Sequence, residues 1–216
     1  MTQRERQERS RREILQAALD EFGHRDYGRV NMESICKNHG ISKGMMYHYY
    51  SGKDDLFLLC VEDTFCALKS YIEQYMAQSR EPDAVAQIKN FFMIREYFFQ
   101  LHPERKLIFE TAILRPPDHL HGQIQKLWSP LRQLNREFLE QVADSVPLRP
   151  CLTREDAARY LECAGTVFRS VLRHCCGDNP PGDLHTLLES AGGALDMLLF
   201  GVLKQDDAPK RDCAPE

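Results

Sequence analysis

Residues 31–53, NMESICKNHGISKGMMYHYYSGK, contain the clearest local structural pattern of the chain. Ile35 and Cys36 lie three and four positions after Met32, so the three side chains share one face of a helix. Asn31 suits the N-cap of that helix, because its side-chain oxygen can accept hydrogen bonds from backbone amides in the first turn. These residues therefore predict a short amphipathic helix that begins at Asn31.

A tight turn and a second short helix follow. Gly40 stands where the chain must turn, a position that favours a residue tolerating a positive φ. Ser42 can cap the next helix, which we expect over residues 43–50 with Met46 facing inward. This arrangement is typical of a helix-turn-helix, whose second helix enters the DNA major groove.

The composition limits the possible classes of protein. The chain has 216 residues, 43% of them hydrophobic, enough for one core with or without a small second domain. A net charge of −4 argues against a nonspecific nucleic-acid coat. The first twelve residues hold five Arg against two Glu, or +3, which suits DNA contacts by a few placed cations.

The sequence predicts a cytoplasmic protein that is not bound to a membrane. The N-terminus is highly charged and lacks the apolar segment of a secretory signal. The most apolar run, residues 194–203, is far shorter than the roughly 20 residues that a membrane span needs. Eight cysteines without a secretory signal indicate reduced thiols in the cytosol.

Nearly all of the remaining sequence has helical periodicity, so we expect an all-α fold of about nine helices. Ser51 with Asp54, and Thr153 with Asp156, have the spacing of capping boxes. We expect Pro130 to kink or interrupt its helix. Three parts are predicted: a DNA-binding domain at 1–56 with a basic N-terminal arm, a helical effector-binding and dimerisation domain at 57–204, and a disordered tail at 205–216.

The last two predicted helices, about 154–175 and 184–204, carry apolar residues at alternating intervals of four and three. Such seams pack against other helices, either within the chain or in a four-helix bundle with a second copy. Further apolar residues beside the seams favour a homodimer. The expected interface residues are Leu161, Ala164, Phe168, Leu188, Ala191, Leu195 and Leu198.

Residues 11–57 resemble the TetR family of bacterial transcriptional regulators. The resemblance lies in an amphipathic first helix, the unit at 31–42, and the run MYHYYSGKDDL at 46–56. It implies a homodimer that represses genes at a palindromic operator and leaves the DNA when a small molecule enters its C-terminal domain. No cofactor is implied.

The resemblance and the chemistry of the residues together suggest roles in DNA binding. Tyr47 resembles the phosphate-binding tyrosine of the family, and Lys53 lies at a helix start, which also favours a phosphate. Tyr47 in core packing alone, and His48 as a plain solvated residue, are the alternatives. Asn31 is expected to contact a phosphate while it caps its helix, and Lys43, Gly44, Met45 and His48 are expected to lie along base edges. The predicted DNA-binding residues are thus Asn31, Ser42, Lys43, Gly44, Met45, Tyr47, His48, Tyr49 and Lys53.

The effector site is less clearly indicated, because an aromatic stripe at helical spacing is more often core than cavity. We expect a mostly apolar ligand, and Arg95 is available to pair with an anionic one. The expected pocket residues are Phe65, Phe92, Arg95, Phe99, Trp128 and Phe168.

The alternatives to a ligand-responsive regulator are a thiol- or metal-responsive regulator and an enzyme. A thiol- or metal-responsive regulator would use Cys163, His174, Cys175 and Cys176, although buried cysteines are also ordinary core residues. An enzyme is not expected, since the sequence has no phosphate-binding glycine loop, no HExxH, no GxSxG and no plausible pairing of a nucleophile with a base. The pair His119 and His121 is a weaker candidate for metal binding, and no metal ligand set is predicted.

Overall fold

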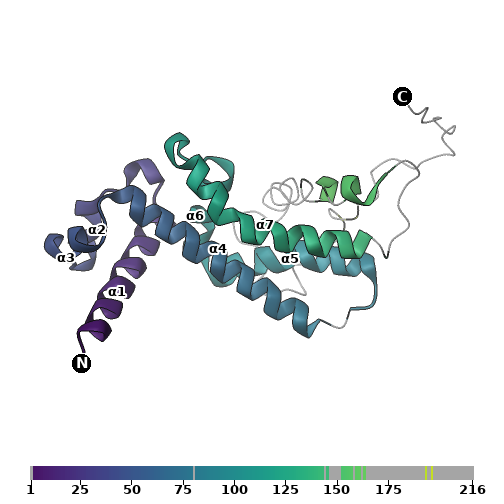
Figure 1. Cartoon of the computed structure of the whole chain (residues 1–216), viewed down its shortest axis with the longest axis horizontal. Coiled ribbons are helices and arrows are strands. Elements are labelled where there is room, and N and C mark those ends of the chain that lie inside the picture. The colour runs from purple at the N-terminus through teal and green to yellow at the C-terminus, as the bar shows by residue number, and fades with distance from the viewer. Residues whose placement is uncertain are drawn as a thin grey trace. The chain divides into compact units, whose positions relative to one another are not determined.

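The computed structural model describes residues 2–79, 81–143, 145, 152–157, 159–161, 163, 193 and 196. Every regular element within these residues is a helix, so the predicted all-α fold is confirmed (Figure 1). The elements in chain order, with η marking a 3-10 helix, are α1 (Gln3–His24), η1 (Tyr27–Arg29), α2 (Met32–His39), α3 (Lys43–Tyr49), α4 (Lys53–Gln78), α5 (Ala84–Leu101), α6 (Pro103–Leu114), η2 (Asp118–Leu120) and α7 (His121–Ala143).

The chain forms two compact units. Unit 1 comprises Met1–Glu73 and Leu101–Arg132, and unit 2 comprises Gln74–Gln100 and Gln133–Glu216. Unit 1 thus contains the predicted helix-turn-helix together with α6, η2 and the first part of α7.

Helix α1 begins earlier than the apolar periodicity indicates, at Gln3 rather than at residue 11. Thr2 and Glu5 form a capping box, in which the Thr2 hydroxyl accepts from the Glu5 amide and the Glu5 carboxylate accepts from the Thr2 amide. A capping box satisfies two backbone donors at once, which stabilises a helix start without any apolar packing. The basic N-terminal residues are therefore helical.

The predicted helix-turn-helix is confirmed in its details. The Ser34 amide donates to the Asn31 side chain over 2.8 Å, and the Met45 amide donates to the Ser42 hydroxyl over 3.1 Å. Gly40 ends α2 in the left-handed conformation with φ 65°. The side chain of Met46 is fully buried and fixes the inner face of α3.

The predicted capping box of Ser51 with Asp54 is wrong. Ser51 instead donates from its amide over 2.9 Å, and from its hydroxyl, to the carboxylate of Asp55. Helix α4 begins at Lys53, so Asp55 is its third residue, the position from which a carboxylate reaches back to the preceding chain. Asp54 contacts Tyr27 and His119 instead.

In unit 1, α1 packs closely against α6 where Gly23 meets the backbone of Glu104. An aromatic cluster holds α4, α6 and α7 together: Phe65 lies edge-on to Phe109 and to Trp128, with ring centroids 5.9 and 5.0 Å away. Such pairs add to the hydrophobic stabilisation of buried area. Helix α1, which contacts both α2 and α3, therefore joins the helix-turn-helix to α6 within the same unit.

Pro130 was expected to kink or interrupt its helix, and it does not interrupt α7. The helix continues from His121 to Ala143 with Pro130 inside it. Proline lacks the backbone N–H that would bond the carbonyl one turn back, so one hydrogen bond of the helix is missing.

In unit 2, α5 packs on the last part of α7. The rings of Phe91 and Phe138 are stacked with centroids 4.4 Å apart and an interplanar angle of 9°. The buried Arg95 guanidinium donates to the Phe91 carbonyl and, over 2.5 Å, to the side-chain oxygen of Asn135. A buried charge is tolerated only with such partners, so these bonds help define the packing of the two helices.

The predicted capping box at Thr153 is confirmed. The Asp156 amide donates to the Thr153 hydroxyl over 3.1 Å, and that hydroxyl donates to the Asp156 carboxylate over 2.6 Å. Of the expected dimer-interface residues, Leu161 is 8% exposed within the single chain. Ala164, Phe168, Leu188, Ala191, Leu195 and Leu198 lie outside the described residues, as does the predicted tail.

Candidate DNA-binding site

Helix α3 presents its polar face to solvent. Lys43, Gly44 and His48 are exposed, and Tyr47 is 53% exposed although it is a large aromatic residue. Met45 is half-buried beside them. Because Met46 anchors the opposite face, the predicted base-contacting residues share the outer side of one short, fixed helix.

One of these residues already has an acidic partner. The Lys43 ammonium donates to the Glu33 carboxylate of α2 over 2.5 Å. This contact lowers the pKa of Glu33 and raises the pKa of Lys43, in each case first through the hydrogen bond and then through the charge of the partner. Both side chains are well exposed, so solvent and salt weaken the pair. Residue type and spacing alone do not indicate this role of Glu33.

The three residues expected to bind phosphate line one open groove of about 990 Å³. Asn31 reaches it from the start of α2, Tyr47 from α3 and Lys53 from the start of α4. The groove also holds the carboxylates of Asp54 and Asp55. An anion would therefore need to lie toward the cationic and amide side of the groove.

Asn31 and Lys53 both have structural contacts in addition to their predicted roles. The Asn31 oxygen caps α2, which leaves its side-chain amide as a donor. The Lys53 ammonium donates to the Tyr27 carbonyl over 3.2 Å and lies 4.3 Å from the centroid of the Tyr27 ring. An ammonium group has three N–H donors, so Lys53 retains donors for a phosphate.

A polar junction that the sequence did not predict joins the start of α4 to η1 and η2. The Tyr27 hydroxyl donates to the Asp54 carboxylate, and Nε2 of His119 lies 2.8 Å from the other carboxylate oxygen. The Tyr27 hydrogen bond, His119 and the Lys53 charge together lower the pKa of Asp54, while burial and then the contact with Asp54 raise the pKa of Tyr27. The sequence indicates His119 only as a weak metal candidate with His121, whereas the structure gives it a carboxylate partner.

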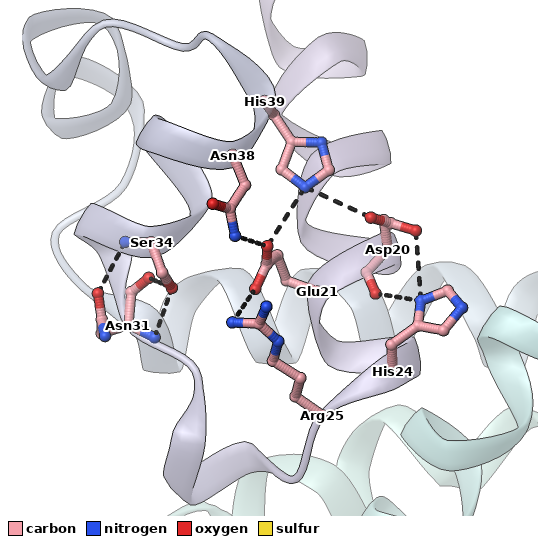
Figure 2. A network of polar contacts seen from close by, with 8 residues as sticks. All are labelled: Asp20, Glu21, His24, Arg25, Asn31, Ser34, Asn38 and His39. Atoms are coloured by element: carbon pink, nitrogen blue, oxygen red, sulfur yellow. Dashed lines mark hydrogen bonds and ion pairs between the residues drawn. The ribbon is translucent and has the colours of Figure 1, made fainter.

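A second polar network orients α2 on α1 (Figure 2). Glu21 of α1 is 5% exposed, accepts from the Asn38 side chain over 2.5 Å and lies 3.4 Å from the Arg25 guanidinium. Nε2 of His39 lies 3.5 Å from the carboxylates of Glu21 and Asp20. Removing one partner of a buried charge leaves that charge uncompensated, so this network strongly favours one arrangement of the two helices.

The predicted effector residues divide between the two units. Phe65 and Trp128 belong to the aromatic cluster of unit 1, whereas Phe92, Arg95 and Phe99 are buried in unit 2. Phe168 lies outside the described residues. A shared pocket formed by these side chains stays a prediction.

The predicted sensor residues are also only partly described. Cys163 is exposed, and His174, Cys175 and Cys176 lie outside the described residues. Elsewhere Cys60 is buried, and burial raises the pKa of its thiol. Within the described part of the chain, no three His, Cys, Asp or Glu side chains form a group that could hold a metal ion. In that same part, no helix is long and apolar enough to span a bilayer.

Comparison with known proteins agrees with this geometry. Residues 14–60 match the sequence model described as bacterial regulatory proteins, tetR family. The HTH-type transcriptional regulator BetI of Brucella anthropi is 25% identical over 175 residues, which cover 79% of this chain and 84% of BetI. The match thus extends well beyond the helix-turn-helix.

Solved structures show the same fold at low sequence identity. The transcriptional regulator FadR from Bacillus subtilis, crystallised in complex with stearoyl-CoA, aligns with a TM-score of 0.67 and 16% identity over 88% of this chain and 98% of FadR. A TetR family transcriptional regulator from Chloroflexus aurantiacus aligns with a TM-score of 0.63 and 22% identity, over 88% of this chain and 92% of that protein.

Proposed function

Since this chain is a transcriptional regulator of the TetR family, we propose that it is a cytoplasmic homodimeric repressor released from a palindromic operator by a small-molecule effector. In this proposal residues 1–56 bind DNA, and residues 57–204 hold the effector and form the dimer. The observation that carries it is helix α3, whose inner face is anchored by Met46 and whose outer face is exposed.

The distribution of contacts around α3 supports this assignment. Phosphate contacts position a protein on DNA and base contacts specify the sequence. Asn31, Tyr47 and Lys53 share the groove beside α3, where they suit the first role, and Gly44 and Met45 lie on the exposed helix, where they suit the second. A methionine side chain there offers apolar contact to a thymine methyl.

The dimer is proposed from sequence periodicity. The seams at 154–175 and 184–204 are apolar over more than one face, and two helices of this kind from each of two chains would form a four-helix bundle. A rigid dimer places two copies of α3 at a fixed separation, so it would select half-sites about one helical turn apart or a multiple of that.

We propose that the effector is a mostly apolar molecule with an anionic group, bound in unit 2. The support is a set of buried aromatic side chains on α5 with the Arg95 guanidinium among them. FadR of Bacillus subtilis, which shares the fold, was crystallised with stearoyl-CoA, a molecule of this general kind. Helix α4 starts at Lys53 beside the groove and its last residues belong to unit 2, so it offers a covalent route for coupling.

The DNA-binding part is tested by measuring affinity for the DNA upstream of the chain's own gene, by fluorescence anisotropy at several salt concentrations. We expect preferential binding to a near-palindrome, weakened by salt. Affinity no higher than for a scrambled duplex at the same salt concentration would refute DNA recognition. Sizing in solution tests the dimer, and a monomer would refute that part.

Gly44→Ala gives a sharper test of which face meets the DNA. A Cβ at Gly44 has open space around it, so the substitution should not disturb folding. It should even stabilise α3 by roughly 0.5–1 kcal/mol, because alanine favours a helix over glycine. Gly122→Ala in α7 is the matched control, since Gly122 also has open space. Weaker operator binding by Gly44→Ala alone is expected, whereas equal affinities would show that α3 does not approach DNA closely.

A further inference from the structure

Helix α1 brings an arginine to the end of helix α3. The Arg11 guanidinium carbon lies 5.6 Å from the centroid of the Tyr49 ring, and Tyr49 is the last residue of α3. This distance is within the range of a cation–π contact. The contact links the basic start of the chain to the surface that the proposed function assigns to DNA.

Arg11 differs from two of its neighbours on α1 in having no carboxylate partner among the described residues. Arg4 pairs with Glu8 over 3.1 Å and Arg9 pairs with Glu13 over 2.8 Å, each one turn further along the helix. Within the described part of the chain no carboxylate forms an ion pair with Arg11, whose side chain belongs to an exposed residue. Its charge is therefore available to an external anion.

The Tyr49 ring is partly packed against neighbouring rings. It is half-buried, and it meets the His48 ring edge-on with centroids 4.9 Å apart and the Tyr50 ring with centroids 6.5 Å apart. A guanidinium that rests against an aromatic ring keeps N–H donors at its edge, and these donors suit the oxygens of a phosphate. The ring thus restricts the arginine without using its hydrogen-bonding groups.

We propose that Arg11 contacts a backbone phosphate of the bound DNA, and that Tyr49 acts as its positioning residue rather than as a reader of bases. The DNA-binding surface then includes the exposed start of α1 as well as α2, α3 and the start of α4. This inference rests on the proposed function, because it concerns DNA bound at α3. It adds one phosphate contact that is independent of base sequence.

The test is the salt dependence of operator affinity for Arg11→Ala in the full-length chain. Losing one phosphate contact should reduce the slope of log K against log salt by about 0.9. When the salt is raised from 50 to 200 mM, the factor by which Arg11→Ala loses operator affinity should consequently be about 3.5 times smaller than the factor for the wild type. Arg11→Lys should retain the wild-type slope. The control is Lys126→Ala, which removes one exposed positive charge from α7 and should leave the slope unchanged.

Two Tyr49 variants separate positioning from direct contact. Tyr49→Phe keeps the aromatic face and should bind like the wild type, whereas Tyr49→Ala should show the reduced slope of Arg11→Ala. The double variant Arg11→Ala/Tyr49→Ala should lose no more than either alone, because both act on one contact. Weakened binding by Tyr49→Phe would refute the positioning role.

The result separates this inference from the proposed function. A wild-type slope for Arg11→Ala, in a chain that binds its operator specifically, would overturn the Arg11 contact alone. Absence of specific binding by the wild-type chain would overturn the proposed function, and the Arg11 contact with it.

Discussion

Substituting Gly23 by alanine should destabilise unit 1 by overpacking the junction of α1 and α6. A methyl group at Gly23 would lie 2.8 Å from the Glu104 Cα and 3.0 Å from its carbonyl carbon, with the carbonyl oxygen nearer still. Side-chain carbons do not approach other atoms so closely. The obstacle is backbone, so it cannot rotate away, and the two helices must separate.

The expected magnitude follows from two opposed terms. Forced overpacking costs about 1–3 kcal/mol, and replacing glycine by alanine in a helix offsets roughly 0.5–1 kcal/mol of that cost. The net loss in the free energy of unfolding is therefore about 1 kcal/mol. For a chain of this size, that corresponds to a fall of about 2–4 °C in the thermal midpoint.

The assay is thermal unfolding followed by helical circular dichroism, with Gly122→Ala as the matched control. A methyl group at Gly122 would meet no other atom within 4 Å, so this substitution should raise the midpoint through helix propensity alone. The difference in the free energy of unfolding between Gly122→Ala and Gly23→Ala therefore measures the cost of overpacking, about 1–3 kcal/mol. If Gly23→Ala proves as stable as Gly122→Ala, the close packing of α1 on α6 is wrong.

Three further substitutions test the site. Asp54→Asn should lower stability at neutral pH by about 1 kcal/mol, an amount discounted for solvent exposure. The folded-state pKa of Asp54 is lowered, so the Asp54 carboxylate stabilises the fold above the ordinary pKa of 3.8, and this stabilisation is lost as the pH falls. The free energies of unfolding of the variant and the wild type should therefore become equal in acid. Glu33→Gln removes the carboxylate that pairs with Lys43, so operator affinity in anisotropy titrations at low salt should rise. Unchanged affinity would count against Lys43 as a DNA contact. Met45→Ala should change operator preference in a binding selection, and an identical preferred sequence would argue against base contact by Met45.

The helix-turn-helix was predictable because its determinants are local. Asn31, Gly40 and Ser42 each act on backbone groups within a few residues, so their roles follow from residue type and spacing. The early start of α1 does not follow from periodicity, because the charged residues after Thr2 and Glu5 lack an apolar pattern, although these two residues have capping-box spacing.

Contacts between distant residues explain what the sequence did not predict about the site. The junction of Asp54 with His119 joins positions 65 residues apart, and no local pattern identifies such a pair. Asp54 lies three residues after Ser51, so residue spacing alone favours the nearer partner over His119. The choice of Asp55 instead depended on where α4 begins, and helix ends are the features that periodicity defines least well.

The contacts of the buried Glu21 determine how much of the chain must accompany the helix-turn-helix if it is transferred to another protein. Asn38 and His39 lie within the helix-turn-helix, yet they meet the Glu21 carboxylate of α1. A graft of residues 31–53 alone would place these two side chains against whatever the recipient carries in its first helix. A chimaera intended to bind the same operator should therefore contain residues 20–53 as one segment, so that it includes Glu21 and Arg25 together with the helices that they orient.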